Sequence, residues 1–154
     1  MRLDETELVR WGNHIGQAIK APAFIGLSGE LGAGKSVLAR AIGTGAGVAA
    51  PMPSPSYTLV HRYPAAAGRT LVHIDLYRIN SPDDLWELGW SQLADTDEIV
   101  LVEWPARAGF LLPEDRWLIE LACPVGLPGM RDVEVRRIGS PPELAEFSMV
   151  PLDQ

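Results

Sequence analysis

Lysine and cysteine are both scarce in this chain. Cys123 is the only cysteine among 154 residues, so the chain forms no internal disulfide, which fits a reducing compartment such as the cytoplasm. Only two of the 13 basic residues are lysines, 20 residues are acidic, and the net charge is −7. Neutralising nucleic-acid phosphates requires a basic stripe, so this composition disfavours binding of RNA or DNA by the chain alone.

Long apolar runs are also missing. No stretch approaches the roughly 20 residues that a membrane-spanning helix needs. Asp4, Glu5 and Glu7 stand where a signal peptide would carry its apolar core. We therefore expect a cytoplasmic protein that has no membrane partner. An apolar content of 47% and a charged content of 21% are ordinary for globular proteins, and the length predicts a single domain over residues 1–154.

Apolar periodicity predicts several helices. Residues 4–20 have the three- and four-residue spacing of an amphipathic helix, and Asp4 with Glu7 predicts a capping box at its start. A second helix is expected after residue 35, ended by three glycines, Gly43, Gly45 and Gly47. Ser81 is the expected N-cap of a further helix. Residues 141–147 are interpreted as a short helix or an ordered tail.

Short apolar runs between these helices predict strands. The expected strands are 23–27, 57–63, 70–74, 98–102, 117–122 and 132–137. The last two are separated by prolines and glycines and are expected to form an antiparallel pair. Strands that alternate with helices are typical of an α/β fold, and the final pair without a helix between its members predicts a mixed, mostly parallel sheet.

The chemistry-bearing motif is Gly-Glu-Leu-Gly-Ala-Gly-Lys-Ser at residues 29–36, which fits G-x-x-x-x-G-K-[ST]. Such a loop points backbone N–H groups at phosphate oxygens, and glycine is needed because side chains would block the approach. We expect Lys35 to reach the β- and γ-phosphates and Ser36 to ligate Mg²⁺. The match lies between an expected strand and an expected helix, which favours a three-layer P-loop NTPase-like fold over a glycine-rich surface turn.

Two acids follow apolar strands and are candidate metal-site residues. Asp75 ends Thr-Leu-Val-His-Ile-Asp, and Glu103 ends Ile-Val-Leu-Val-Glu. Ligands of α/β sheets bind at the carboxyl ends of the strands, so both carboxylates are expected to face the loop at 29–36. We expect Glu103 nearer the metal and the attacking water, and Asp75 on a metal-bound water. The alternative is that each acid simply ends a strand at the surface.

A proline-stiffened segment at 51–58 is the expected switch-like loop. Its Ser54 and Ser56 are placed where P-loop proteins often carry a hydroxyl near the γ-phosphate, although an ordinary loop turn has the same composition. His61 and His73 lie in or beside strands without metal-ligand spacing, so no metal role is expected for them.

Four segments together resemble the bacterial TsaE (YjeE) family, small P-loop ATPases of tRNA threonylcarbamoyladenosine biosynthesis. They are Gly29–Ser36, Ser54–Val60 (Ser-Pro-Ser-Tyr-Thr-Leu-Val), His73–Arg78 (His-Ile-Asp-Leu-Tyr-Arg) and Val102–Pro105 (Val-Glu-Trp-Pro). Their order and spacing agree over roughly residues 8–138. The sequence departs from the family pattern at three positions, with Ser56 for Thr, Val37 for a second Thr and Glu30 for Asp.

The resemblance implies ATP/ADP and Mg²⁺ as cofactors. Lys35, Asp75 and Glu103 are the implied catalytic residues, and Ser36, Asp75 and Glu103 the implied metal ligands. The implied nucleotide-binding residues are Glu30, Leu31, Gly32, Ala33, Gly34, Lys35, Ser36, Val37, Ser56, Trp104 and Arg131.

The resemblance also implies a role and partners. The role is partner-dependent ATP hydrolysis that resets the threonylcarbamoyl transferase complex, which modifies adenosine 37 of tRNAs reading codons that begin with A. The implied partners are TsaD and TsaB, with tRNA contacted only through the complex. A small-metabolite P-loop kinase and a nucleotide-gated binding module without turnover are the alternatives.

Overall fold

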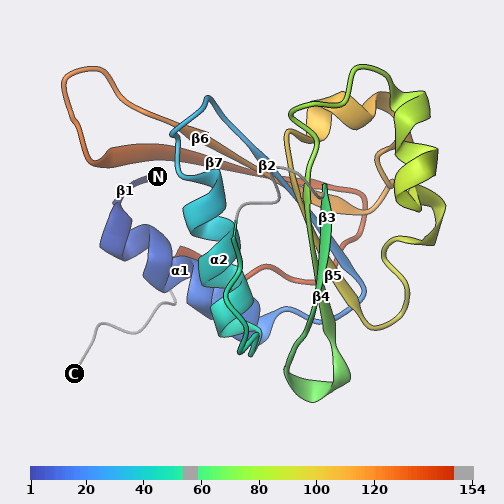
Figure 1. Ribbon diagram of the computed structural model, residues 1–154. Helices are drawn as coiled ribbons and strands as arrows, with labels where there is room; N and C mark the ends of the chain where they lie inside the picture. The colour runs from blue at the N-terminus through green and yellow to red at the C-terminus, as the bar shows by residue number, and fades with distance from the viewer. Residues whose placement is uncertain (54–58, 148–154) are drawn as a thin grey trace.

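Seven strands form one mixed sheet in this computed structural model, which describes residues 1–53 and 59–147 (Figure 1). The strands are β1 (Arg2–Asp4), β2 (Ala23–Ser28), β3 (Val60–Pro64), β4 (Thr70–Asp75), β5 (Glu98–Glu103), β6 (Arg116–Ala122) and β7 (Met130–Ile138). Their order is β1-β7-β6-β2-β5-β4-β3. The four central strands are parallel, and the pairs β1–β7, β6–β7 and β3–β4 are antiparallel. The expected mixed, mostly parallel α/β sheet is confirmed.

Side-chain alternation along the central strands divides the core into two buried clusters. Ile25 and Leu101 belong to the cluster under α1 (Glu5–Ala18) and α2 (Lys35–Gly45). Phe24 and Val102 belong to the cluster on the opposite face. That face is covered by three 3₁₀ segments, η2 (Pro82–Leu88), η3 (Trp90–Gln92) and η4 (Pro105–Leu111). The three layers are therefore α-helices, sheet and 3₁₀ segments (Figure 1).

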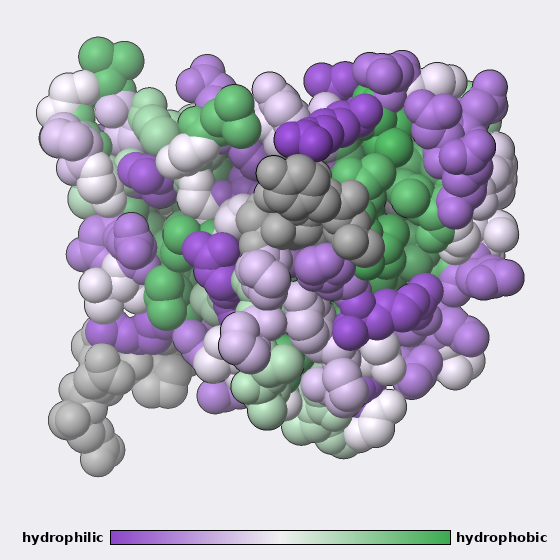
Figure 2. Space-filling model, viewed as in Figure 1, coloured by the Kyte–Doolittle hydropathy of each residue, from purple (hydrophilic) through white to green (hydrophobic). Residues whose placement is uncertain are grey.

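The helix expected from residue 81 begins there, but it is a 3₁₀ helix. The Ser81 side chain accepts a hydrogen bond from the Asp83 backbone N–H, and Gly89 ends the segment with a left-handed φ of 74°. Figure 2 shows apolar side chains gathered between β3 and this layer, with hydrophilic residues around them. A further 3₁₀ turn, η1 (Ala66–Gly68), connects β3 to β4.

Glycines allow α1 and α2 to pack closely, and Gly43 does not end the second helix as expected. Gly43 lies inside α2, whereas Gly45 is its last residue, as expected. A Cβ on Gly45 would lie 2.0 Å from the Asn13 carbonyl oxygen, and a Cβ on Gly16 would lie 2.0 Å from the Ile42 carbonyl oxygen. The glycine signal thus reports the close approach of two helix backbones. Of the three, only Gly47, with a φ of 91°, lies beyond the helix end.

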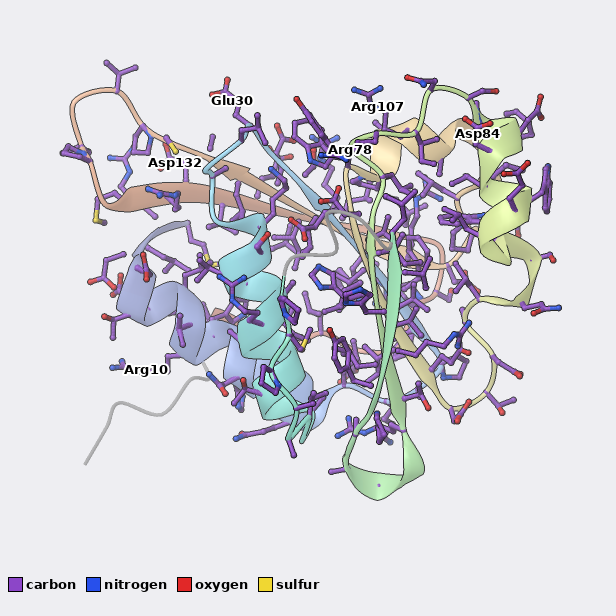
Figure 3. All side chains as sticks on the ribbon, in the orientation of Figure 1. Arg10, Glu30, Arg78, Asp84, Arg107 and Asp132 are labelled. Carbon is purple, nitrogen blue, oxygen red and sulfur yellow. The ribbon has the colours of Figure 1, made fainter. Side chains whose placement is uncertain are left out.

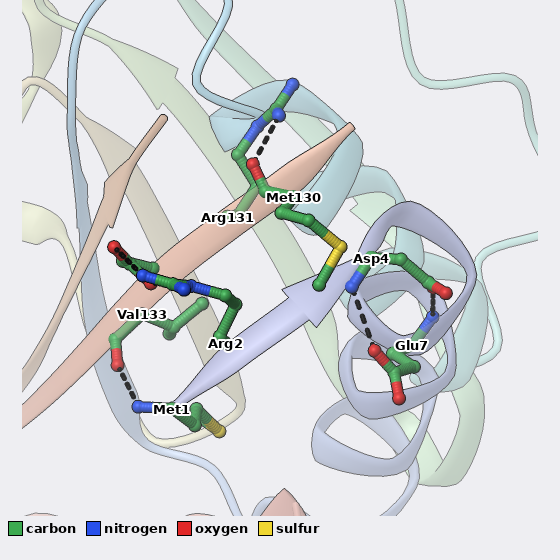
Figure 4. Close-up of polar contacts among 8 residues, drawn as sticks. Met1, Arg2, Asp4, Glu7, Met130, Arg131 and Val133 are labelled. Atoms are coloured by element: carbon green, nitrogen blue, oxygen red, sulfur yellow. Dashed lines mark hydrogen bonds and ion pairs between the residues drawn. The ribbon is translucent and has the colours of Figure 1, made fainter. Parts of the chain in front are cut away.

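The start of α1 agrees with the expected capping box. Asp4 accepts from the Glu7 backbone N–H at 2.8 Å, and Glu7 accepts from the Asp4 backbone N–H at 2.8 Å (Figure 4). The strand β1 directly before it was not predicted, because three residues carry too little pattern. It pairs with β7, where the Arg2 side chain also bonds Asp132.

Residues 141–146, near the end of the described chain, are an ordered tail. Residues 141–146 form neither helix nor strand, yet the indole of Trp11 donates to the Ala145 carbonyl at 2.8 Å and the indole of Trp117 donates to the Pro142 carbonyl at 2.7 Å. The expected strand at 57–63 appears as β3, and residues 57 and 58 lie outside the described residues. No helix within the described ranges is long and apolar enough to cross a membrane.

Candidate phosphate-binding site

The predicted loop connects β2 to α2, as its mechanism requires. Gly29, Gly32 and Gly34 have φ angles of 144°, 80° and 105°, which disfavour any side chain with a Cβ. A Cβ on Gly32 would meet nothing within 4 Å, so backbone conformation alone demands glycine there. Gly34 is the N-cap of α2 and offers no side-chain hydrogen bond, so no cap side chain competes for the N–H groups of the first helical turn.

The side chain of Lys35 extends back into the loop that precedes it. Its Nζ donates to the carbonyl oxygens of Gly29 at 2.7 Å and Glu30 at 2.8 Å, and the side chain is almost fully buried. Burial lowers the pKa of Lys35, while the negative charges of Glu103 and Asp75 oppose that shift. The two carboxylates therefore help to keep a cation in a desolvated position beside the loop.

Trp104 adds an aromatic face to this cation. The Lys35 Nζ lies 4.4 Å from the centre of the Trp104 ring, which is cation–π distance. The same ring lies 5.1 Å from the Tyr77 ring. Trp104 has a left-handed φ of 60°, unusual for a bulky residue, and such strain costs on the order of 1–3 kcal/mol. That backbone conformation occurs at the turn between β5 and η4, where the ring packs against the site.

The two strand-end acids lie side by side. β4 and β5 are parallel neighbours, and their register pairs Asp75 with Glu103. The Ser36 hydroxyl donates to Glu103 Oε1 at 3.0 Å, although the two residues are 67 positions apart in the chain. Glu103 is only 3% exposed, so it is not an ordinary surface acid. The geometry brings together Lys35, Ser36 and both acids, the grouping expected from the motif.

Asp75 has a different environment from Glu103. One of its oxygens, Oδ1, accepts from the backbone N–H of Tyr77 at 2.9 Å. Burial raises the pKa of Asp75; the Tyr77 hydrogen bond lowers it, and the charge of Glu103 raises it further. Its carboxylate is thus held by its own turn and is harder to ionise than a solvent-exposed one.

His73 is a member of the site that sequence reasoning missed. Its Nε2 lies 2.7 Å from Glu103 Oε2, and the ring is completely buried. The available signal was the two-residue step from His73 to Asp75, which places both side chains on the same face of β4. A buried histidine in an apolar strand has the same pattern whether or not it contacts an acid, so the pattern alone did not reveal the partner.

Arg131 reaches the loop from β7. Its Nε donates to the Ala33 carbonyl at 2.8 Å, and its Nη2 lies 3.3 Å from the Gly32 carbonyl oxygen. A third bond runs to the carbonyl of Met130 (Figure 4). The guanidinium therefore braces the loop backbone, in addition to lining the same cavity as the predicted residues.

A cavity of about 460 Å³ opens in front of the loop. The predicted residues that line it are Leu31, Gly32, Gly34, Lys35, Ser36, Val37, Asp75, Glu103, Trp104 and Arg131. Ala33 is completely buried and Glu30 lies at the loop tip, so neither lines the cavity (Figure 3). Leu59, Tyr77 and Arg78 line it without having been predicted. Ser54 and Ser56 lie outside the described residues.

The oxygen atoms at the cavity floor suit Mg²⁺. Magnesium favours one or two protein oxygen ligands completed by phosphates and water. Ser36 Oγ and Glu103 Oε1 provide two such oxygens 3.0 Å apart. Within residues 1–53 and 59–147 there is no group of three or more His, Cys, Asp or Glu that could hold a metal by itself. The arrangement fits an ion shared with a phosphate better than a closed protein cage.

A glycine-rich loop between a parallel strand and a helix, beside carboxylates at adjacent strand ends, defines a P-loop protein of the α/β class. The family model described as "Threonylcarbamoyl adenosine biosynthesis protein TsaE" matches residues 3–125. The chain therefore belongs to the TsaE family.

Curated relatives and a solved structure agree with this assignment. The chain is 34% identical over 123 residues to a Haemophilus influenzae protein, covering 77% of each chain. It is 32% identical over 142 residues to a Streptomyces coelicolor protein, covering 90% of this chain and 96% of that one. Both are named tRNA threonylcarbamoyladenosine biosynthesis protein TsaE. YdiB of Bacillus subtilis has a similar fold, with a TM-score of 0.69 at 21% identity over 90% of this chain and 84% of that one.

Proposed function

We propose that this protein is an Mg²⁺-dependent ATPase of tRNA threonylcarbamoyladenosine synthesis, weak alone and dependent on its partners. The observation that carries the proposal is the 3.0 Å contact between Ser36 Oγ and Glu103 Oε1, beside the Lys35 ammonium and inside one cavity. Family membership supports the pathway, and the site supports the chemistry. The relatives' names refer to tRNA modification and do not mention ATP.

Each site residue has a distinct task in this proposal. Lys35 exchanges its bonds with the loop carbonyls for bonds with phosphate oxygens, and its charge offsets the charge that develops during phosphoryl transfer. Glu103 accepts a hydrogen bond from the Ser36 hydroxyl, which leaves the lone pairs of the Ser36 oxygen free to ligate a metal. Asp75 would hold the metal indirectly, through a metal-bound water. Mg²⁺, when bound, supplies charge neutralisation at the phosphates.

The partners in the proposal are TsaD and TsaB, and hydrolysis resets their transferase complex in the cytoplasm between turnovers. tRNA is contacted only through that complex. The net charge of −7 supports this arrangement, because an acidic chain gains little from phosphate contacts. Of its two lysines, Lys35 is committed to the loop.

The test compares hydrolysis by wild type, Lys35→Ala and Lys20→Ala, each with and without TsaD and TsaB. Lys20 is the other lysine, exposed and just beyond α1, so its variant controls for the loss of one charge. We expect stimulated hydrolysis in wild type and Lys20→Ala, and none in Lys35→Ala. Normal hydrolysis by Lys35→Ala would disprove the site. Phosphoryl transfer to a metabolite without need of the partners would favour a small-metabolite kinase instead.

A further inference from the structure

We propose that His73 is a positioning residue, whose Nε2–H fixes the Glu103 carboxylate so that its other oxygen faces Ser36. The inference rests on the proposed function for its kinetic consequence, and on geometry for the contact itself. His73 Nε2 and Glu103 Oε2 lie 2.7 Å apart, and Glu103 Oε1 lies 3.0 Å from Ser36 Oγ. One carboxylate thus connects β4, β5 and α2.

The burial of the pair makes this contact consequential. His73 is 0% exposed and Glu103 is 3% exposed, so Oε2 has no ready replacement from bulk water. A carboxylate oxygen that is buried without a partner costs more free energy than the hydrogen bond contributes. Without His73, the Glu103 side chain is therefore expected to rotate toward another hydrogen-bond donor. That rotation would break its contact with Ser36.

The hydrogen-bond pattern identifies which ring nitrogen carries the proton. His73 Nδ1 is buried and has no hydrogen-bond partner within the described residues 1–53 and 59–147. Nε2 faces a carboxylate oxygen, which accepts hydrogen bonds and has none to donate, so Nε2 must be the donor. The ring is therefore the tautomer with its proton on Nε2, which donates to Glu103 Oε2.

Mutating a residue that orients a metal-binding group through a hydrogen bond generally lowers metal affinity or activity by about tenfold or more. His73 is not among the residues that line the cavity, and its hydrogen bond to the site is the one to Glu103. We therefore expect its removal to lower kcat with little change in KM, because only the orientation of the carboxylate changes. A role in packing alone predicts no such split.

The test uses three single variants of two histidines, together with Glu103→Gln alone and combined with His73→Leu. His73→Leu fills similar space without a hydrogen-bond donor. His73→Gln places an amide N–H near the position of the His73 Nε2–H. His61→Leu is the matched control, because His61 is in register with His73 on β3 but pairs with Tyr63. Melting temperatures of all variants establish that they fold.

We expect His73→Leu to lower the partner-stimulated kcat about tenfold with KM within about threefold, as loss of a hydrogen bond to a charged group predicts. His73→Gln should recover most of the loss, and His61→Leu should behave as wild type. His73→Leu should have little further effect in a Glu103→Gln background, because both changes break the same connection. Equal kcat in wild type and His73→Leu, or equal losses in the Leu and Gln variants, would overturn the proposal.

A second readout does not depend on turnover. Nitrogen NMR of the wild-type imidazole should show His73 protonated at Nε2 and bare at Nδ1. A proton on Nδ1 would overturn the proposal even if the kinetics agreed. If wild type hydrolyses no ATP with TsaD and TsaB, the proposed function fails, and the NMR result alone decides whether His73 donates to Glu103.

Discussion

The ends of β4 and β5 lie side by side, yet they hold their acids differently. Glu103, at the end of β5, has both oxygens engaged by other elements, one by Ser36 of α2 and one by His73 of β4. Asp75, at the end of β4, bonds the backbone two residues further along its own chain. Glu103 is deeply buried, whereas Asp75 is partly exposed.

The difference teaches that equal positions in a sheet do not give equal roles. A carboxylate whose rotamer is fixed by two separate elements is preorganised for a metal or a reacting water. The Asp75 carboxylate instead uses one oxygen to stabilise the turn that follows β4, which leaves its other oxygen to contact a ligand in the cavity. The comparison therefore assigns the larger catalytic effect to Glu103.

Replacing Glu103 tests this comparison most strongly. Glu103→Gln keeps the shape of the side chain and removes its charge. We expect kcat of the partner-stimulated reaction to fall at least about tenfold, about 1.4 kcal/mol of barrier, with ATP affinity within a few-fold. Steady-state kinetics beside an ATP titration in Mg²⁺ provide the measurement. Normal hydrolysis would show that Glu103 only ends its strand, and would leave Asp75 to serve the metal.

Replacing Asp75 should have a smaller and broader effect. An acid that helps to hold the metal acts on bound ATP as well as on the transition state, so Asp75→Asn should raise KM and lower kcat together, each by about threefold. The same assay measures both constants. A kcat loss larger than that of Glu103→Gln would reverse the assignment of the two acids.

The smallest expected effect is on stability and concerns pH. Because burial raises the pKa of Asp75, the folded protein retains this proton at pH values where the unfolded chain has released it. The free energy of unfolding contributed by Asp75 therefore falls as pH rises from its ordinary pKa of 3.8 through the raised value. Asp75→Asn should thus gain stability relative to wild type as pH rises above about 4.

Urea unfolding across this range measures the difference. Asp132→Asn is the control, because Arg2 lowers the pKa of Asp132 and places its titration below the same window. Its difference from wild type should stay nearly constant. A gap between Asp75→Asn and wild type that is also constant would contradict the unequal environments of the two strand-end acids.

Much of the fold and part of the site followed from local pattern. The loop at 29–36, the capping box of Asp4 and the apolar strands that end in Asp75 and Glu103 are all encoded within a few neighbouring residues. The strand β1 was missed because the strand that pairs with it, β7, lies about 130 residues away. Such pairing leaves almost no trace in a three-residue segment.

Other differences arise where one residue type serves two structures. Glycine ends helices and also permits close helix packing, and Gly45 does both, because it is the last residue of α2 and lies against Asn13 of α1. The signals at Ser81 predict a helical start but do not separate an α-helix from a 3₁₀ helix. An arginine such as Arg131 can donate to a phosphate or to a backbone carbonyl, and its bonds to Gly32 and Ala33 depend on tertiary structure.

The antiparallel pairing of β1 with β7 has a consequence for the rate of folding. Its Arg2–Asp132 contact spans 130 residues, whereas the His73–Glu103 contact spans 30. Closing the longer loop costs about 1.3 kcal/mol more chain entropy, since the cost grows as about (3/2)RT ln n. The parallel centre of the sheet is therefore expected to assemble first and the β1–β7 edge last. Because Arg131 on β7 braces the carbonyls of Gly32 and Ala33, the glycine-rich loop should reach its final shape only in that last step.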